Sequence, residues 1–174
     1  MNENIRKIVL TAVLAALTFV ATMFIQIPLI NGYANVGDSV IFIAGIVLGP
    51  VWGAVAAGVG SALADIALSY GVYAPATLVI KAVMGLIIGL IYKKAENKES
   101  SAGAFITMII AAIIAEAVMV AGYFLFETVL YSSAATALLS LGGNALQGVV
   151  NAIVAVLLYK VLGKVLKSLR GDKM

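Results

Sequence analysis

Long apolar runs, separated by short polar or glycine- and proline-rich breaks, make up nearly the whole chain. Polar and apolar residues do not alternate as they would in barrel strands, so the runs indicate helices. The expected helices cover about residues 5–27, 39–48, 51–68, 75–94, 103–127 and 138–162. We therefore expect an all-α integral membrane protein with six transmembrane helices, forming a single domain over residues 1–174.

The second run, residues 39–48, is the exception to this simple pattern. Spanning a bilayer takes about 20 residues. This run is too short to cross alone unless part of the preceding loop, residues 28–38, dips into the membrane. The other breaks are a Gly49-Pro50 pair, a turn at 69–71 and a polar linker at 95–101.

Composition supports a membrane protein and narrows its chemistry. The chain is 63% hydrophobic and 11% charged, whereas a soluble domain is nearer half apolar and a quarter charged. It has no Cys and no His, which removes thiol and imidazole catalysts and the usual zinc ligands. We expect no metal and no cofactor. A membrane enzyme would depend on a carboxylate pair, and Asp65 and Glu116 lie in no recognisable catalytic motif.

The basic residues predict the orientation. Ten of the eleven Lys and Arg residues fall on one side of a six-helix arrangement, in the N-terminal segment, the linker after residue 92 and the C-terminal tail. Basic loops favour the cytoplasmic side. We therefore expect a multi-pass protein of a bacterial-type plasma membrane, with both termini in the cytoplasm. This placement accounts for the calculated pI of 9.2 without a nucleic-acid partner. The first apolar run is longer than a typical signal-peptide core, so we expect it to be retained.

Three ionisable residues lie inside apolar runs, where a charge is costly unless it is paired or faces a polar cavity. Asp65 is near the outer end of its expected helix, Lys81 is roughly 9 Å below the outer end of the next, and Glu116 is roughly 20 Å from the cytoplasmic side. Tyr123 and Glu127 share the helical face of Glu116.

Three amides add a further polar face. Asn144, Gln147 and Asn151 are spaced i, i+3 and i+7 in the last expected helix. Four helices thus bring polar groups to the outer half of the bilayer, which indicates a small-molecule binding cavity. Aromatic walls are available from Tyr33, Tyr73 and Tyr123.

Structural interpretations stand beside the functional one. Asp65 and Lys81 form a plausible structural ion pair, and Glu116 is an alternative partner for Lys81. The amides can serve as hydrogen-bond links between helices, and Tyr70, Tyr73 and Tyr131 can be interfacial aromatics. Rows of small residues, such as Gly53-Ala57-Ser61 and Gly85-Gly89, indicate close helix packing.

Four segments together resemble the substrate-binding (S) component of energy-coupling factor (ECF) vitamin transporters, over essentially the whole chain. They are TAVLAALTFV with its Ala12-x-x-x-Ala16, NGYANVGDS at 31–39, GPVWGAVAAGVGSALAD ending at Asp65, and GNALQGVVN in the last helix. The likeness is nearest to the group associated with hydroxymethylpyrimidine, pyridoxine or riboflavin-like substrates.

The resemblance implies a subunit that binds a vitamin or precursor from outside and docks on a membrane coupling subunit driven by two ABC-type ATPases. Residues 32–38 would form part of a lid, and Ala12 and Ala16 would contact the coupling subunit. The candidate substrate-binding residues are Asn35, Asp38, Asp65, Tyr73, Lys81, Glu116, Tyr123, Asn144 and Gln147. The alternative is a stand-alone secondary transporter with Asp65 or Glu116 as its proton-coupling group, although no internal repeat is evident.

Overall fold

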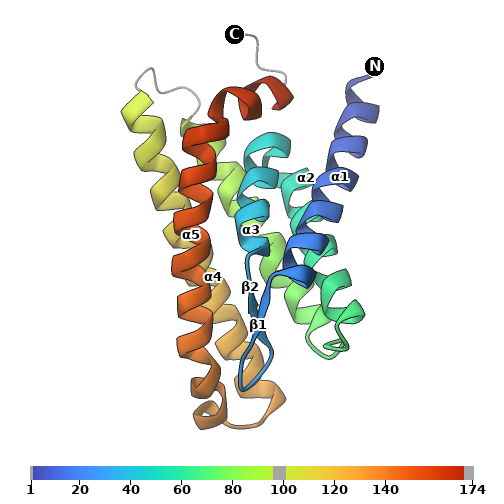
Figure 1. Cartoon of the computed structure of the whole chain (residues 1–174), viewed down its shortest axis with the longest axis vertical. Helices are drawn as coiled ribbons and strands as arrows, with labels where there is room; N and C mark the ends of the chain where they lie inside the picture. The colour runs from blue at the N-terminus through green and yellow to red at the C-terminus, as the bar shows by residue number, and fades with distance from the viewer. Residues whose placement is uncertain (1, 96–100, 171–174) are drawn as a thin grey trace.

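The computed structural model describes residues 2–95 and 101–170 as a helical bundle with one short hairpin (Figure 1). The elements are α1 (Glu3–Phe24), β1 (Gln26–Pro28), β2 (Tyr33–Asn35), α2 (Gly37–Ala67), α3 (Ala74–Ala95), α4 (Ser101–Leu130) and α5 (Ala134–Arg170). The start of α1 and the end of α5 lie at the same end of the bundle, here named the termini end (Figure 1). The opposite end is named the far end.

Within the described residues, five helices are long and apolar enough to cross a membrane, so the prediction of six transmembrane helices is wrong. The expected helices at 39–48 and 51–68 both lie in α2, which is interrupted at Gly49 (φ 75°, ψ −173°) before Pro50. A Cβ on Gly53 would lie 2.8 Å from the Cα of Gly45, although residues eight apart in a straight helix are separated by about 12 Å. The chain therefore folds back at Gly49.

The fold of α2 gives the reason for the miscount. Its first arm, residues 37–48, measures only about 18 Å, against the roughly 30 Å of a bilayer core. The positive φ of Gly49 suits a residue without a Cβ, and Pro50 is tolerated because it begins the second arm. A break that ends one spanning helix and a break that bends a re-entrant one have the same Gly-Pro signature.

An antiparallel hairpin begins at Gln26, within the expected first helix, and continues into the expected loop at 28–38, because α1 ends at Phe24 rather than at Ile27. Gln26 pairs with Asn35 and Pro28 with Tyr33, around a turn in which Gly32 has φ +75°. At the tip of the hairpin, Asn31 Nδ2 donates to the carbonyl of Thr136, 3.1 Å away at the start of α5.

The hairpin fills the part of the bundle that the short arm of α2 leaves open. From its anchored tip at the far end it runs inward to Asn35, whose backbone contacts α5 about 20 Å from the start of that helix. The preceding loop therefore does dip between the helices, as the short run at 39–48 requires.

Close glycine contacts join α2 to its neighbours, which confirms the packing role predicted for the small-residue rows. A Cβ on Gly85 of α3 would lie 2.7 Å from the carbonyl oxygen of Gly53, and one on Gly58 would lie 2.7 Å from that of Leu78. Gly60 makes an equally close approach to the backbone of Ala15 in α1. Such spacing leaves no room for a side chain, so α2 lies against both neighbours backbone to backbone.

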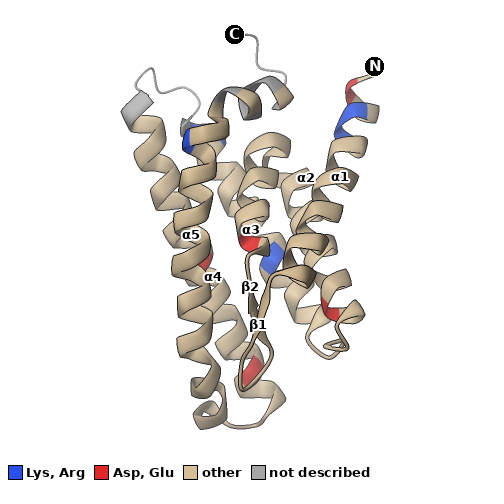
Figure 2. Ribbon diagram, in the orientation of Figure 1, with Lys and Arg blue, Asp and Glu red and all other residues tan. Residues whose placement is uncertain are grey.

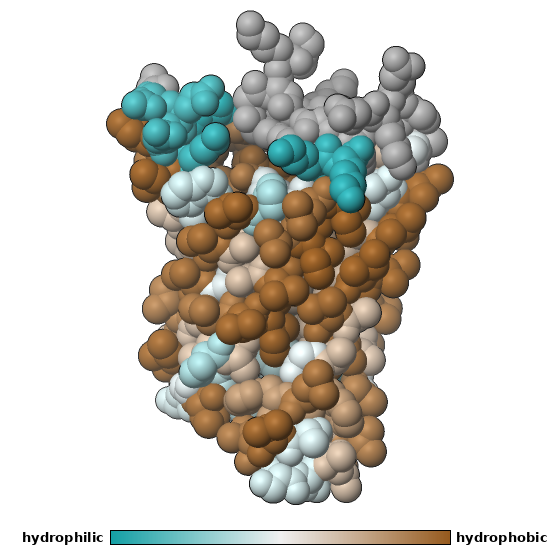
Figure 3. Space-filling view, turned by 180° about the vertical axis from the view of Figure 1, so that it is seen from behind, coloured by the Kyte–Doolittle hydropathy of each residue, from teal (hydrophilic) through white to brown (hydrophobic). Residues whose placement is uncertain are grey.

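The outer surface matches a bilayer environment. Apolar side chains cover the sides of the bundle, and hydrophilic ones gather towards the termini end (Figure 3). Figure 2 shows Lys and Arg at the termini end and one further cation in the centre of the bundle. Among the described Lys and Arg residues, Lys81 is the one that is buried, at 2% exposed. The side of the membrane that the termini end faces stays a prediction.

Candidate functional site

Asp38 is the centre of the polar interior. It lies in the first turn of α2, where the positive end of the helix dipole favours a carboxylate. Lys81 Nζ of α3 lies 2.5 Å from Asp38 Oδ1, and Gln147 Nε2 of α5 donates to Asp38 Oδ2 at 2.6 Å. Three elements thus meet at one carboxylate that is 1% exposed. A charge pair at this depth is tolerated because each partner satisfies the other.

The amide face of α5 holds the backbone of the hairpin. Gln147 Oε1 accepts from the Asn35 N–H at 2.9 Å, and Asn151 Nδ2 donates to the Asn35 carbonyl at 2.7 Å. Asn151 Oδ1 also accepts from the backbone and the hydroxyl of Ser39, at 2.9 and 2.8 Å. These amides are therefore more than links between helices, since they fix the end of the hairpin and the start of α2.

Two tyrosines bind two buried carboxyl groups. The Tyr33 hydroxyl donates to Asp65 Oδ1 at 2.6 Å, and the Tyr73 hydroxyl donates to Glu127 Oε1 at 3.3 Å. Burial, followed by the charge of Asp65, raises the pKa of Tyr33 well above its usual value. Burial also raises the pKa of Tyr73. Both phenols therefore stay neutral and keep their donors at physiological pH.

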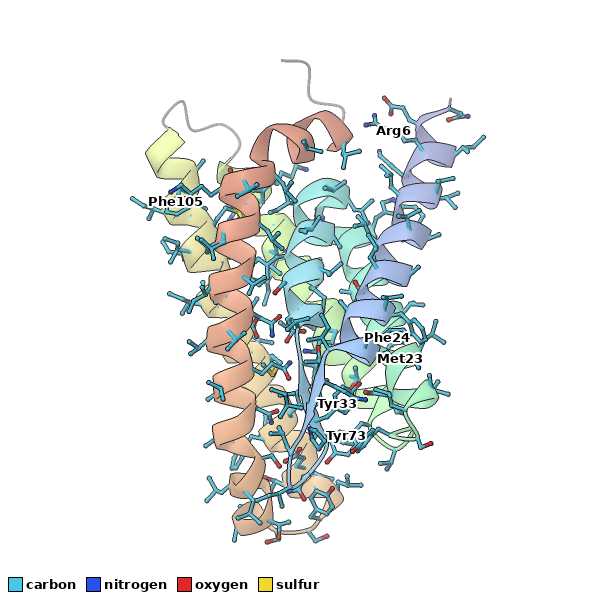
Figure 4. The ribbon with its side chains drawn as sticks, viewed as in Figure 1. Arg6, Met23, Phe24, Tyr33, Tyr73 and Phe105 are labelled. Atoms are coloured by element: carbon cyan, nitrogen blue, oxygen red, sulfur yellow. The ribbon has the colours of Figure 1, made fainter. Side chains whose placement is uncertain are left out.

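Aromatic rings line the same region. The ring centroids of Tyr33 and Tyr70 are 5.0 Å apart, those of Tyr70 and Tyr73 are 6.3 Å apart, and Lys81 Nζ lies 5.5 Å from the centre of the Tyr123 ring. Figure 4 shows Tyr33 of the hairpin and Tyr73 close together, and a Cβ on Gly32, next to Tyr33, would lie 3.8 Å from the Tyr73 ring. Rings of this kind supply apolar walls with polar edges.

These groups enclose a cavity of about 30 Å³ between the hairpin and the helices, room for about two water molecules. The lining residues are Thr22, Asn31, Gly32, Tyr33, Asn35, Ser61, Asp65, Tyr70, Tyr73, Thr77, Lys81, Tyr123, Glu127, Asn144 and Gln147. The wall thus combines one cation, two carboxyl groups, amides, hydroxyls and four tyrosine rings.

The structure brings most of the predicted site residues together. Seven of them line the cavity, namely Asn35, Asp65, Tyr73, Lys81, Tyr123, Asn144 and Gln147. Asp38 lies behind two of these side chains and holds them. Among the described residues, Lys81 forms its ion pair with Asp38 rather than with Asp65 or Glu116, the two partners that the sequence left open.

Glu116 lies elsewhere. It borders an apolar groove of about 530 Å³ between α4 and α5, and neither of its carboxyl oxygens has a hydrogen-bond partner among the described residues. A Cβ on Gly148 of α5 would lie 3.2 Å from the Glu116 Cβ, so its side chain lies at the contact between these two helices.

The sequence analysis did not identify several hydroxyl-bearing residues as part of the cavity wall. Thr22 of α1, Ser61 of α2 and Thr77 of α3 are all buried, and Thr77 Oγ1 lies 2.9 Å from the Tyr123 hydroxyl. The sequence did contain one indication of a polar face on α1, because Thr11, Thr18 and Thr22 share one side of this otherwise apolar helix. Threonine is tolerated in lipid through bonds to its own helix, so this stripe alone does not identify a cavity.

Comparison with known proteins gives consistent findings. Residues 2–164 match the family described as "ECF-type riboflavin transporter, S component". A relative from Pyrococcus woesei, described as an uncharacterized protein in a gap 3' region, is 33% identical over 157 residues, covering 87% of this chain and 95% of the relative. A solved structure described as "Structure and mechanism of the S component of a bacterial ECF transporter" has a TM-score of 0.66 at 24% identity, covering 95% of this chain and 99% of that one.

Proposed function

Since this chain belongs to the family of ECF-type riboflavin transporter S components, we propose that it binds a small hydroxylated heteroaromatic vitamin or precursor for uptake by an ATP-driven transporter. Riboflavin, the vitamin in the family's description, is the first candidate. Hydroxymethylpyrimidine and pyridoxine are smaller ligands of similar chemistry. The chain acts as a binding subunit without catalysis, and ATP hydrolysis belongs to its partners.

The observation that carries this proposal is the combination of aromatic and polar groups in one cavity. Tyr33, Tyr73 and Tyr123 offer faces for a flat ring, while Asn144, Gln147 and Lys81 offer placed donors and acceptors for ring substituents. Mostly apolar walls with a few oriented polar groups are typical of small-molecule sites. One interior cation, already paired with Asp38, does not suit a highly charged anion.

The cavity of about 30 Å³ is too small for a vitamin, so the hairpin that covers it must move before a ligand can bind. We name this hairpin, residues 26–35, the lid. Four hydrogen bonds tie the lid to described residues distant in sequence, from Asn31, from Tyr33 and at both backbone atoms of Asn35. At about 0.5–1.5 kcal/mol each, they hold it by about 2–6 kcal/mol. Displacing the lid frees Gln147 Oε1 and Asp65 Oδ1, and a bound vitamin then replaces the contacts that the lid gives up.

The proposed partners are a membrane coupling subunit and two ABC-type ATPases, with both termini in the cytoplasm and the lid outside. Ala12 and Ala16 are exposed on the outer face of α1, where small residues allow a partner helix to approach closely. The opposite face of α1, with Leu14 and Thr18, is buried in the bundle.

Identification of the ligand tests the proposal. The protein is purified in detergent, any bound ligand is identified by mass spectrometry, and riboflavin, pyridoxine and hydroxymethylpyrimidine are titrated by calorimetry. We expect one of them to bind at nanomolar strength. Asn144→Ala should weaken binding at least tenfold, about 1.4 kcal/mol, whereas Asn4→Ala, at the exposed start of α1, should leave it unchanged.

The second candidate function is a stand-alone, proton-coupled transporter. The observation in its favour is Glu116, a buried carboxyl in a membrane helix whose oxygens have no partner among the described residues. This function predicts uptake into vesicles that is driven by a pH gradient without ATPases and is abolished by Glu116→Gln. If no such uptake occurs and a vitamin binds tightly, the proton-coupled transporter is excluded and the S-component function remains.

A further inference from the structure

A second cavity lies at the termini end, far from the lid. It has a volume of about 360 Å³ and lies between the start of α1, the bend of α2 and the ends of α3 and α5. We name it the basic cleft, because its lining within the described residues includes Arg6, Lys7 and Lys93, with Glu3 as the one acidic residue in that described lining. Its volume is within the range of small-molecule sites.

The charged rim of the basic cleft comes from helices distant in sequence. Arg6 and Lys7 lie in the first turns of α1, and Lys93 lies in the last turn of α3. Arg6 already donates to the carbonyl of Leu169 near the end of α5, and Figure 4 shows Arg6 directed from α1 towards that helix. A guanidinium is always charged at physiological pH, so Arg6 adds positive charge to the basic cleft beside its bond to Leu169.

The floor of the basic cleft is apolar. It is formed by Leu10 of α1 and by Val47 and Leu48, just before the Gly49 bend of α2. Beside it, Val9 and Val13 are 47% and 49% exposed on the outer surface of α1. The apolar floor thus continues into a surface that faces lipid. An amphiphile with an anionic head and an apolar tail complements both parts.

We propose that the basic cleft binds the phosphate group of an anionic phospholipid, with its acyl chains along the outer face of α1. The ends of membrane-spanning helices lie in the headgroup layer, and a basic pocket there attracts anionic lipids. Three cations against one carboxylate disfavour a zwitterionic lipid, whose own cation would meet Arg6 or a lysine. The apolar floor disfavours a free phosphate. This site is separate from the vitamin cavity and does not rest on the proposed function.

The test uses the full chain, delipidated in detergent and titrated with phosphatidylglycerol or phosphatidylcholine of the same acyl chains, with binding followed by native mass spectrometry. We expect phosphatidylglycerol to bind at least tenfold more tightly, and glycerol 3-phosphate, the water-soluble analogue of its head, not to bind measurably. Arg6→Gln and Lys93→Gln should each weaken phosphatidylglycerol binding at least fivefold.

Two further variants test whether the lipid binds in the basic cleft itself or is attracted by positive charge anywhere on this surface. Lys94→Gln removes an exposed charge next to Lys93 but outside the basic cleft, and it should change the affinity by less than twofold. Leu10→Trp fills the floor without altering any charge and should weaken binding. Thermal unfolding of each variant shows whether it is folded.

Other results would overturn the proposal. These are equal affinity for the two lipids, an equal loss in Lys94→Gln and Lys93→Gln, and tight binding of glycerol 3-phosphate without a lipid tail. Retention of lipid by Arg6→Gln together with loss of a co-purifying acidic protein would assign the basic cleft to a protein partner instead.

Discussion

At the scale of single residues, Asp38 is the central acceptor of the polar interior, because its two carboxylate oxygens bind Lys81 and Gln147 at the same time. It lies in the first turn of α2, and its partners come from α3 and α5. The buried pair and the tyrosine–carboxylate bonds lead to two predictions.

The first prediction concerns the ion pair. Removing either partner leaves the other charge buried, so Lys81→Met and Asp38→Asn should each lower the free energy of unfolding by about 3–5 kcal/mol. The double variant should lose clearly less than the sum, because no uncompensated charge remains. Denaturant unfolding in mixed micelles measures all four proteins. Strict additivity would show that the two side chains do not stabilise each other.

The second prediction concerns pH. The pKa of Tyr33 is raised from an ordinary 10.0, so the folded protein keeps this proton when the unfolded chain loses it. The stability is therefore complete below pH 10 and falls as pH rises above it. Tyr33→Phe has no proton to lose and should flatten this fall in thermal unfolding between pH 9 and 11. It should also weaken the lid, since it removes the 2.6 Å bond to Asp65.

Sequence predicted which residues are buried and polar better than it predicted their partners. The spacing of Asn144, Gln147 and Asn151 placed them on one face, and all three are at most 7% exposed. For Lys81, however, the sequence offered Asp65 and Glu116 as partners, and the structure pairs it with Asp38, which was expected in the loop at 28–38. The choice of Asp38 depends on the bend of α2, which brings its first turn to mid-bundle, and no local pattern encodes that distance.

At the scale of elements, the lid and the short arm of α2 complete each other. The arm covers about 18 Å, and the hairpin occupies the depth that the arm leaves. Turn-forming residues at 28–38 indicated a break but not paired strands, because three residues on each side are too few for a visible alternation.

The third prediction fixes the lid in place. The chain has no Cys, so Asn31→Cys with Thr136→Cys adds a single thiol pair where the tip already contacts α5. Cross-linking with a short thiol reagent should slow vitamin binding and release at least tenfold, measured by stopped-flow fluorescence. Asn31→Cys alone, treated in the same way, is the control. Unchanged exchange in the cross-linked protein would show that ligand enters without lid movement.

At the scale of the whole molecule, α1 has two distinct faces. Thr11, Leu14 and Thr18 are buried against the bundle, whereas Ala12 and Ala16 lie on the exposed side. The polar cavity proposed to bind the vitamin and the proposed docking face are therefore on separate surfaces, and a change to one need not disturb the other.

The fourth prediction follows from this separation. Ala12→Trp with Ala16→Trp should leave vitamin affinity within about twofold of the wild type but prevent co-purification with the coupling subunit. Ile106→Trp with Ile110→Trp, on the exposed surface of α4 rather than of α1, is the control for added bulk. Intact assembly of the Ala12/Ala16 variant would remove these two residues from the docking role.

The amides of α5 recognise the lid through the N–H and carbonyl of Asn35, which every residue type but proline can present. The docking of the lid and the chemistry of its side chains are thus separate properties. Under the proposed function, substitutions in β2 would alter which ligand is accepted while the lid still closes against the same two side chains. One closing mechanism would then serve binding proteins with different substrates.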